Sequence, residues 1–114
     1  MVLRTTADKM HSLMRTYDFI GRYGGEEFLV ILPDCGLACA AAFAERLRLS
    51  VSSDCIDTPE GMIPVTISFG VAASSKERMK DADSFVKAAD EALYRAKKNG
   101  RNRVEVAPDD EMMV

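Results

Sequence analysis

The sequence has few cysteines and no long apolar run, and each shortage narrows the possible classes of protein. Three cysteines in 114 residues, without CxxC spacing, are too few for a disulfide framework. They fit a reducing compartment and small buried side chains better than a metal site. No apolar run approaches transmembrane length, and the N-terminus lacks the pattern of a signal peptide, so we expect a soluble, cytoplasmic segment without membrane contact.

An excess of basic charge is also missing. Fifteen Lys and Arg residues stand against 18 Asp and Glu residues, which gives a net charge of -3 and a pI near 5.1. This balance argues against nucleic acid or an anionic membrane as a partner, so any phosphate chemistry must come from a local cluster.

Hydrophobic residues make up 47% of the chain, and 114 residues are enough for one domain with one core. Helical spacing predicts helices over residues 1–15, from 37 to about 51, and from about 82 to Gly100. β-Prone runs predict strands over 17–23, 27–32, 63–73 and 103–106. The order predicts an α+β fold with helices packed on a mainly antiparallel sheet. We expect residues 1–106 to form the domain and the acidic tail 107–114 to be disordered.

The stretch RYGGEEF, residues 22–28, joins two of these strands. Gly24 and Gly25 predict a hairpin turn, because glycine adopts positive φ without steric cost. Successive strand residues point to opposite faces, so Glu26 and Glu27 can approach one ion only if a bend or bulge turns them together. On these residues alone, solubilising charge at an exposed turn is the favoured interpretation.

This stretch resembles the signature of the GGDEF family of diguanylate cyclases, in its GGEEF form. Three more stretches resemble the same family in the right order: RTYD at 15–18, PVTISFGVA at 64–72 and DEALYRAKKNGRNRV at 90–104. The resemblance implies a palm-like α+β domain, similar to that of adenylyl cyclases and ferredoxin-like in topology. It also implies that two GTP, each held by one chain of a homodimer, are condensed into cyclic di-GMP with release of pyrophosphate.

The resemblance assigns roles at the signature. Glu26 and Glu27 would be catalytic and would hold Mg²⁺ or Mn²⁺, for which carboxylate oxygens are suitable ligands. Gly24 and Gly25 would let the backbone approach the nucleotide closely, in addition to forming the turn.

Lys97 and Arg101 match the family's triphosphate contacts. The alternative is that both residues only complement the helix dipole beside a cap at Gly100. If phosphates bind at this helix C-terminus, the two cationic side chains must supply the attraction themselves, because the dipole there is unfavourable to anions.

Arg15 and Asp18 match the family's product-inhibition motif, RxxD, and Arg46 matches its secondary contact to the same ligand. A planar guanidinium and a carboxylate suit a guanine dinucleotide. The alternative is a weak ion pair at the surface.

The family's domain begins before residue 1 of this chain, with a strand that carries a metal-binding aspartate and a helix and loop that recognise guanine. We therefore expect this chain to be a fragment, lacking the first strand, that binds Mg²⁺-GTP poorly and whose exposed sheet edges favour dimerisation. A sensory or receiver domain would precede it in the parent protein. Two other functions stay open: a non-catalytic module that binds cyclic di-GMP, and a structural or dimerisation domain that binds no nucleotide.

Overall fold

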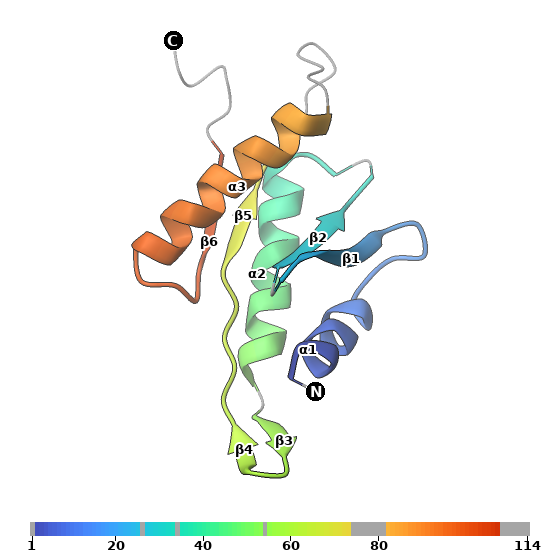
Figure 1. Cartoon of the computed structure of the whole chain (residues 1–114). Helices are drawn as coiled ribbons and strands as arrows, with labels where there is room; N and C mark the ends of the chain where they lie inside the picture. Colours follow the sequence, from blue (N-terminus) through green and yellow to red (C-terminus); the bar gives the residue numbers. More distant parts are fainter. Residues whose placement is uncertain (1, 26, 34, 54, 74–81, 108–114) are drawn as a thin grey trace.

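The structure is a computed structural model that describes residues 2–25, 27–33, 35–53, 55–73 and 82–107. The chain order of its elements is α1 (Val2–His11), β1 (Phe19–Gly24), β2 (Glu27–Ile31), α2 (Leu37–Ser53), β3 (Ile56–Thr58), β4 (Gly61–Ile63), β5 (Phe69–Val71), α3 (Ala82–Lys98) and β6 (Val104–Val106) (Figure 1). The predicted α+β class is confirmed. Within these ranges, no helix combines the length and apolarity that crossing a bilayer requires.

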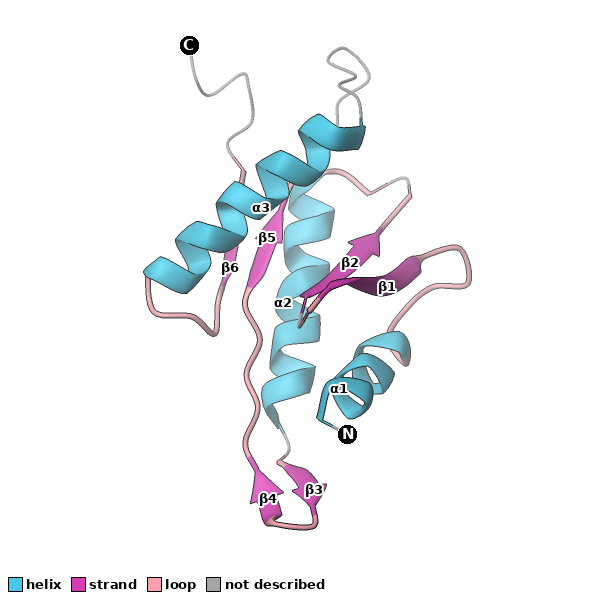
Figure 2. Cartoon of the chain, viewed as in Figure 1, coloured by secondary structure: helices cyan, strands magenta, loops and turns pink. Residues whose placement is uncertain are grey.

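Helix α2 organises the core. Its residues Ala40, Ala44, Leu47 and Val51 are buried and recur at helical spacing, as the sequence predicted. One end of this stripe packs with α1 and the β1–β2 hairpin, and the other end packs with β5 and β6. Figure 2 shows α2 in the middle of the molecule, with the hairpin on the right, β5 and β6 on the left, and α3 running from the upper right across to the left. Truncating the fully buried Leu47 to alanine would cost about 2–5 kcal/mol of stability.

Strands β1 and β2 form the predicted antiparallel hairpin, with Phe19 opposite Ile31. Gly25 has a φ of 49°, which is the left-handed conformation that the turn requires. The register shifts between Arg22 and Gly24, so a bulge lies directly before the turn. A bulge of this kind changes the direction in which the following side chains point.

Strands β5 and β6 pair in parallel, and α3 forms the crossover between them. Gly70 in β5 lies directly under this helix. A Cβ built on Gly70 would come within 2.1 Å of the Ala89 carbonyl oxygen and 2.3 Å of the Leu93 nitrogen. The missing side chain therefore lets α3 lie in backbone contact with the strand.

The predicted strand over 63–73 divides into two parts. Its start belongs to β4, which pairs with β3, and its end is β5. Pro64 contributes to this break, because proline has no N–H to donate to a ladder. The described strands form three two-stranded sheets, two of them antiparallel.

The first helix is also shorter than predicted, since α1 ends at His11 and not at residue 15. Beyond it the Leu13 and Met14 nitrogens donate to carbonyls three residues earlier, so the chain continues in tight turns. Met10 is fully buried and Met14 is partly buried against the same cluster, so both belong to the core.

The expectation that the cysteines are small buried side chains was wrong. Cys35 and Cys39 form a disulfide with their Cα atoms 5.4 Å apart, and Cys55 is free and exposed. Cys35 lies just before α2 and Cys39 lies in its first turn. Residues four apart at the start of a helix come close enough for a disulfide.

Candidate functional site

The hairpin turn carries the signature residues. Arg22 donates from Nη2 to the carbonyl of Gly25, and its guanidinium lies 6.0 Å from the centre of the Phe28 ring. A Cβ on Gly24 or Gly25 would meet nothing within 4 Å, so packing within the described chain does not require glycine at either position. Glu26, predicted to be a catalytic metal ligand, lies outside the described residues.

The C-terminal end of α3 reaches this hairpin. The Lys97 Nζ lies 3.7 Å from the Glu27 Oε1, although the two residues are far apart in the sequence. The side chains of Lys97 and Glu27 are 40% and 43% exposed. Because both side chains are this exposed, the ion pair contributes little stability. For the same reason, both groups remain accessible to a ligand.

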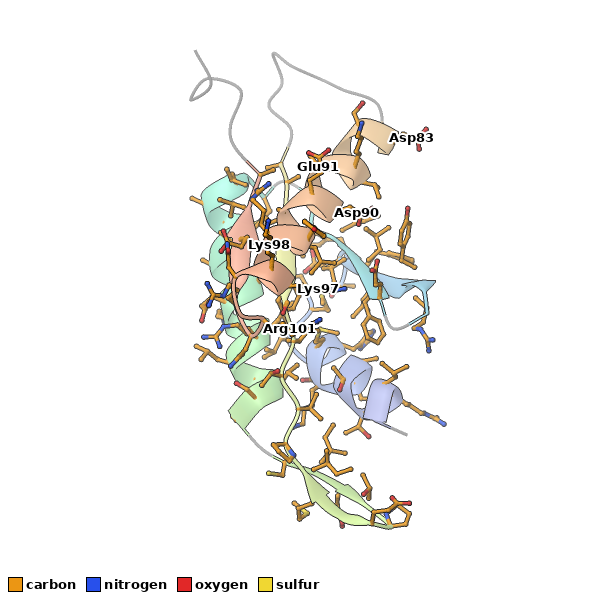
Figure 3. All side chains as sticks on the ribbon, turned by 60° about the vertical axis from the view of Figure 1, so that its left-hand side comes forward. Asp83, Asp90, Glu91, Lys97, Lys98 and Arg101 are labelled. Carbon is orange, nitrogen blue, oxygen red and sulfur yellow. A yellow bond between two sulfur atoms is a disulfide. The ribbon has the colours of Figure 1, made fainter. Side chains whose placement is uncertain are left out.

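Arg101 follows the end of α3 in a left-handed backbone conformation. Gly100, Arg101 and Asn102 have φ values of 122°, 62° and 49°, and the Arg101 nitrogen donates to the Ala96 carbonyl over 2.9 Å. This cap reverses the chain and leaves the Arg101 side chain exposed. Figure 3 shows Asp83 at the start of α3, Asp90 and Glu91 near its middle, and Lys97, Lys98 and Arg101 at its end. Asp83 in the first turn and Lys97 and Lys98 in the last turn complement the helix dipole.

Arg15 and Asp18 form a tight pair. Arg15 donates from Nη2 to the Asp18 Oδ1 over 2.8 Å and from Nε to both carboxylate oxygens, and the Arg15 backbone N–H donates to the Asp18 Oδ2. The Asp18 side chain is fully buried while that of Arg15 is 33% exposed. These hydrogen bonds lower the pKa of the Asp18 carboxyl and raise the pKa of the Arg15 guanidinium. Of the two side chains, Arg15 is the one that a ligand can reach.

Two further contacts fix the direction of Arg15. Its Nη2 donates to the Pro33 carbonyl over 3.1 Å, and its guanidinium lies 4.6 Å from the centre of the Tyr17 ring. Arg46, the other predicted inhibitory residue, is exposed on α2 with its guanidinium 5.7 Å from the Phe43 ring. Within the described residues, no hydrogen bond or ion pair joins Arg46 to Arg15.

A shallow pocket of about 240 Å³, which no sequence pattern predicts, lies between α1 and the hairpin. Asp8 and His11 line it from α1, and Arg22 and Phe28 line it from the hairpin. Its helical and strand residues are distant in sequence and carry no pattern that links them. His11 is exposed.

The described residues include no group of three or more His, Cys, Asp or Glu side chains that could hold a metal ion. Glu27 alone supplies a carboxylate at the described part of the turn. Mg²⁺ is commonly bound through one or two carboxylates together with substrate phosphates and water. These residues therefore fit a metal that binds together with a phosphate ligand, and they do not form a complete metal cage.

The chain is similar to known proteins over most of its length. Residues 1–103 match the family model described as "Diguanylate cyclase, GGDEF domain". The response regulator PleD of Caulobacter vibrioides is 46% identical over 105 residues, which cover 90% of this chain and 23% of PleD.

Two solved structures are also similar. Diguanylate cyclase SiaD of Pseudomonas aeruginosa, solved with its activator SiaC, has 38% identity and a TM-score of 0.85 over 93% of this chain and 40% of its own. The GGDEF domain of DgcB from Caulobacter crescentus, solved with c-di-GMP, has 33% identity and a TM-score of 0.84 over 93% of this chain and 63% of its own. The chain spans less than a third of the curated relatives it matches. With the family model matching nearly the whole chain, this protein belongs to the GGDEF family of diguanylate cyclase domains.

Proposed function

We propose that this chain is part of a diguanylate cyclase, a nucleotidyltransferase that condenses two GTP into cyclic di-GMP and releases pyrophosphate. The observation that carries the proposal is the 3.7 Å contact between Glu27 and Lys97. It joins a carboxylate of the signature hairpin to a cation at the end of α3, and both side chains are exposed enough to meet a nucleotide.

The cationic end of α3 would bind the triphosphate. Lys97 and Arg101 would neutralise charge on the β- and γ-phosphates, which become the leaving pyrophosphate. When GTP arrives, Lys97 would exchange its contact with Glu27 for a contact with phosphate. Glu27 would then be free to turn toward the nucleotide.

The carboxylates of the turn would act at the reacting end of the nucleotide. The 3′-hydroxyl of one GTP attacks the α-phosphate of the other, a new P–O bond forms, and the bond to pyrophosphate breaks. Glu26 and Glu27 would bind Mg²⁺ or Mn²⁺, which supplies charge neutralisation when bound. The open space beside Gly24 and Gly25 would let the phosphates approach the backbone. Two such steps close the ring, so we propose a homodimer in which each chain holds one GTP.

We propose that cyclic di-GMP inhibits the enzyme by binding to Arg15, with Asp18 orienting that arginine and Arg46 as a secondary contact. Asp18 holds Arg15 by four hydrogen bonds before any ligand binds, so little side-chain freedom would be lost on binding. The same preorganisation favours a second candidate function, a module that binds cyclic di-GMP without catalysis. DgcB, a relative with a similar fold, was solved with c-di-GMP.

The relatives are several times longer than this chain, and one of them is a response regulator. We therefore propose that in its parent protein the domain is joined to a sensory or receiver domain that controls it.

The test is to incubate the chain with GTP and Mg²⁺, after removal of any co-purified dinucleotide, and to measure cyclic di-GMP by mass spectrometry. Product that disappears in Glu27→Gln but persists in Glu60→Gln, an exposed control on the β3–β4 turn, would support the cyclase. Absence of product with cyclic di-GMP binding that Arg15→Ala removes would support the binding module. If neither GTP nor cyclic di-GMP binds, this chain is a structural or dimerisation domain.

A further inference from the structure

The loop between α3 and β6 has an unusual backbone. Arg101 and Asn102 are consecutive non-glycine residues with φ values of 62° and 49°. Residues other than glycine rarely adopt positive φ. Two of them in succession persist only where neighbouring groups hold the backbone in place. Arg101 is also the exposed cation assigned above to the triphosphate.

Two side chains from other elements hold Asn102. The Asn102 backbone N–H donates to the Ser68 Oγ over 3.0 Å, and the Asn102 Oδ1 accepts from the Arg48 Nη1 over 2.9 Å. Ser68 precedes β5, and Arg48 lies on α2. The loop is therefore tied to α2 and to the segment before β5, while the Arg101 side chain is exposed.

Arg48 is itself held in place. Its Nε donates to the Glu45 Oε1 over 2.9 Å, and its Nη2 donates to the same oxygen. The Arg48 side chain is only 18% exposed. A guanidinium bound on one edge by a carboxylate and on the other by an amide presents little surface to a ligand, so its contribution must pass through Asn102.

We propose that Arg48 is a positioning residue for phosphate binding: by bonding Asn102 it holds Arg101 in the left-handed conformation that presents its guanidinium to the triphosphate. This inference rests on the proposed function. Unlike Lys97 and Arg101, Arg48 would touch no nucleotide. If its role is positioning and not only structural, substituting Arg48 should weaken phosphate binding more than substituting another hydrogen-bonded arginine of the domain.

The test compares Arg48→Gln with Arg95→Gln as a matched control. Arg95 also donates one long-range hydrogen bond, from Nη2 to the Val106 carbonyl over 2.9 Å, but it does not contact the loop at 101–102. Binding of Mg²⁺-GTP and of tripolyphosphate would be measured by titration calorimetry, and stability by urea denaturation. We expect Arg48→Gln to weaken both ligands by about three- to tenfold, as for the loss of one ordering hydrogen bond, and Arg95→Gln to leave both unchanged.

A second variant keeps the inference testable if Arg48→Gln does not fold. Asn102→Ala removes the acceptor and also disfavours the positive φ, which asparagine tolerates better than alanine. We expect it to weaken binding by at least the same factor, with little further loss in the double variant because the two residues act as one unit. If wild type binds GTP and both single variants bind it equally well, the inference is overturned while the proposed function stands. If wild type binds neither ligand, the proposed function fails and the inference fails with it.

Discussion

Gly70→Ala would test whether α3 lies in backbone contact with β5. The added Cβ would come within 2.1 Å and 2.3 Å of backbone atoms of α3, so the helix would have to retreat by about 1 Å to restore ordinary contact. Overpacking a core typically costs 1–3 kcal/mol, and the obstacle here is helix backbone, which cannot rotate away. We therefore expect a loss near 3 kcal/mol, which for a domain of this size lowers Tm by about 12 °C.

Thermal and urea denaturation followed by circular dichroism would measure this loss. Gly24→Ala is the matched control, because a Cβ there meets nothing within 4 Å and the change in chain entropy is the same. The control should unfold within about 2 °C of wild type or slightly above it. A Gly70→Ala variant whose midpoints match those of Gly24→Ala would refute the close contact and, with it, the placement of the middle of α3 against β5.

Three further perturbations follow from the described contacts. Lys97→Ala should weaken Mg²⁺-GTP binding about tenfold in calorimetry, whereas the neighbouring Lys98→Ala should not, since successive helix residues point about 100° apart; equal effects would show that only net charge matters. Asp18→Asn should lower the urea midpoint at pH 7 but much less at pH 3. The lowered pKa of this carboxyl means that its contribution is present above about pH 4 and lost as pH falls through the folded-state value; a gap that stays constant with pH would contradict this. A thiol reductant should lower the stability of wild type by up to about 2 kcal/mol and leave Cys35→Ser unaffected, while Cys55→Ser responds like wild type; unchanged wild-type stability would count against the disulfide.

Local chemistry was enough to predict most elements. Gly24 and Gly25 fixed the hairpin, because the turn needs a residue at positive φ, and Gly25 supplies it. The alanine stripe of α2 was predictable because small residues at helical spacing mark the face that packs closely. The shorter α1 and the division of the strand over 63–73 were not, because both depend on which neighbours supply hydrogen bonds to the backbone.

The candidate site was only partly predictable, for a related reason. Sequence motifs identified Glu27, Lys97 and Arg15, but no pattern along the chain indicates that the first two approach within 3.7 Å. The contact between Arg48 and Asn102 is equally remote in sequence. It was missed because an arginine on an amphipathic helix reads as a solvated side chain until the fold brings a partner to it. The disulfide could have been predicted from the four-residue spacing of Cys35 and Cys39 at the start of a helix. It was not, because the low cysteine count favoured reduced cysteines.

The Glu27–Lys97 contact also spans two separate hydrogen-bonded ladders. The hairpin belongs to the β1–β2 sheet, and α3 belongs to the unit formed with β5 and β6; within the described residues no strand pairing connects them. The two halves of the candidate site are therefore held next to each other by side-chain packing around α2 and not by backbone hydrogen bonds between strands. A ligand that touches both halves would connect them directly, and we expect it to slow amide exchange in the two ladders together.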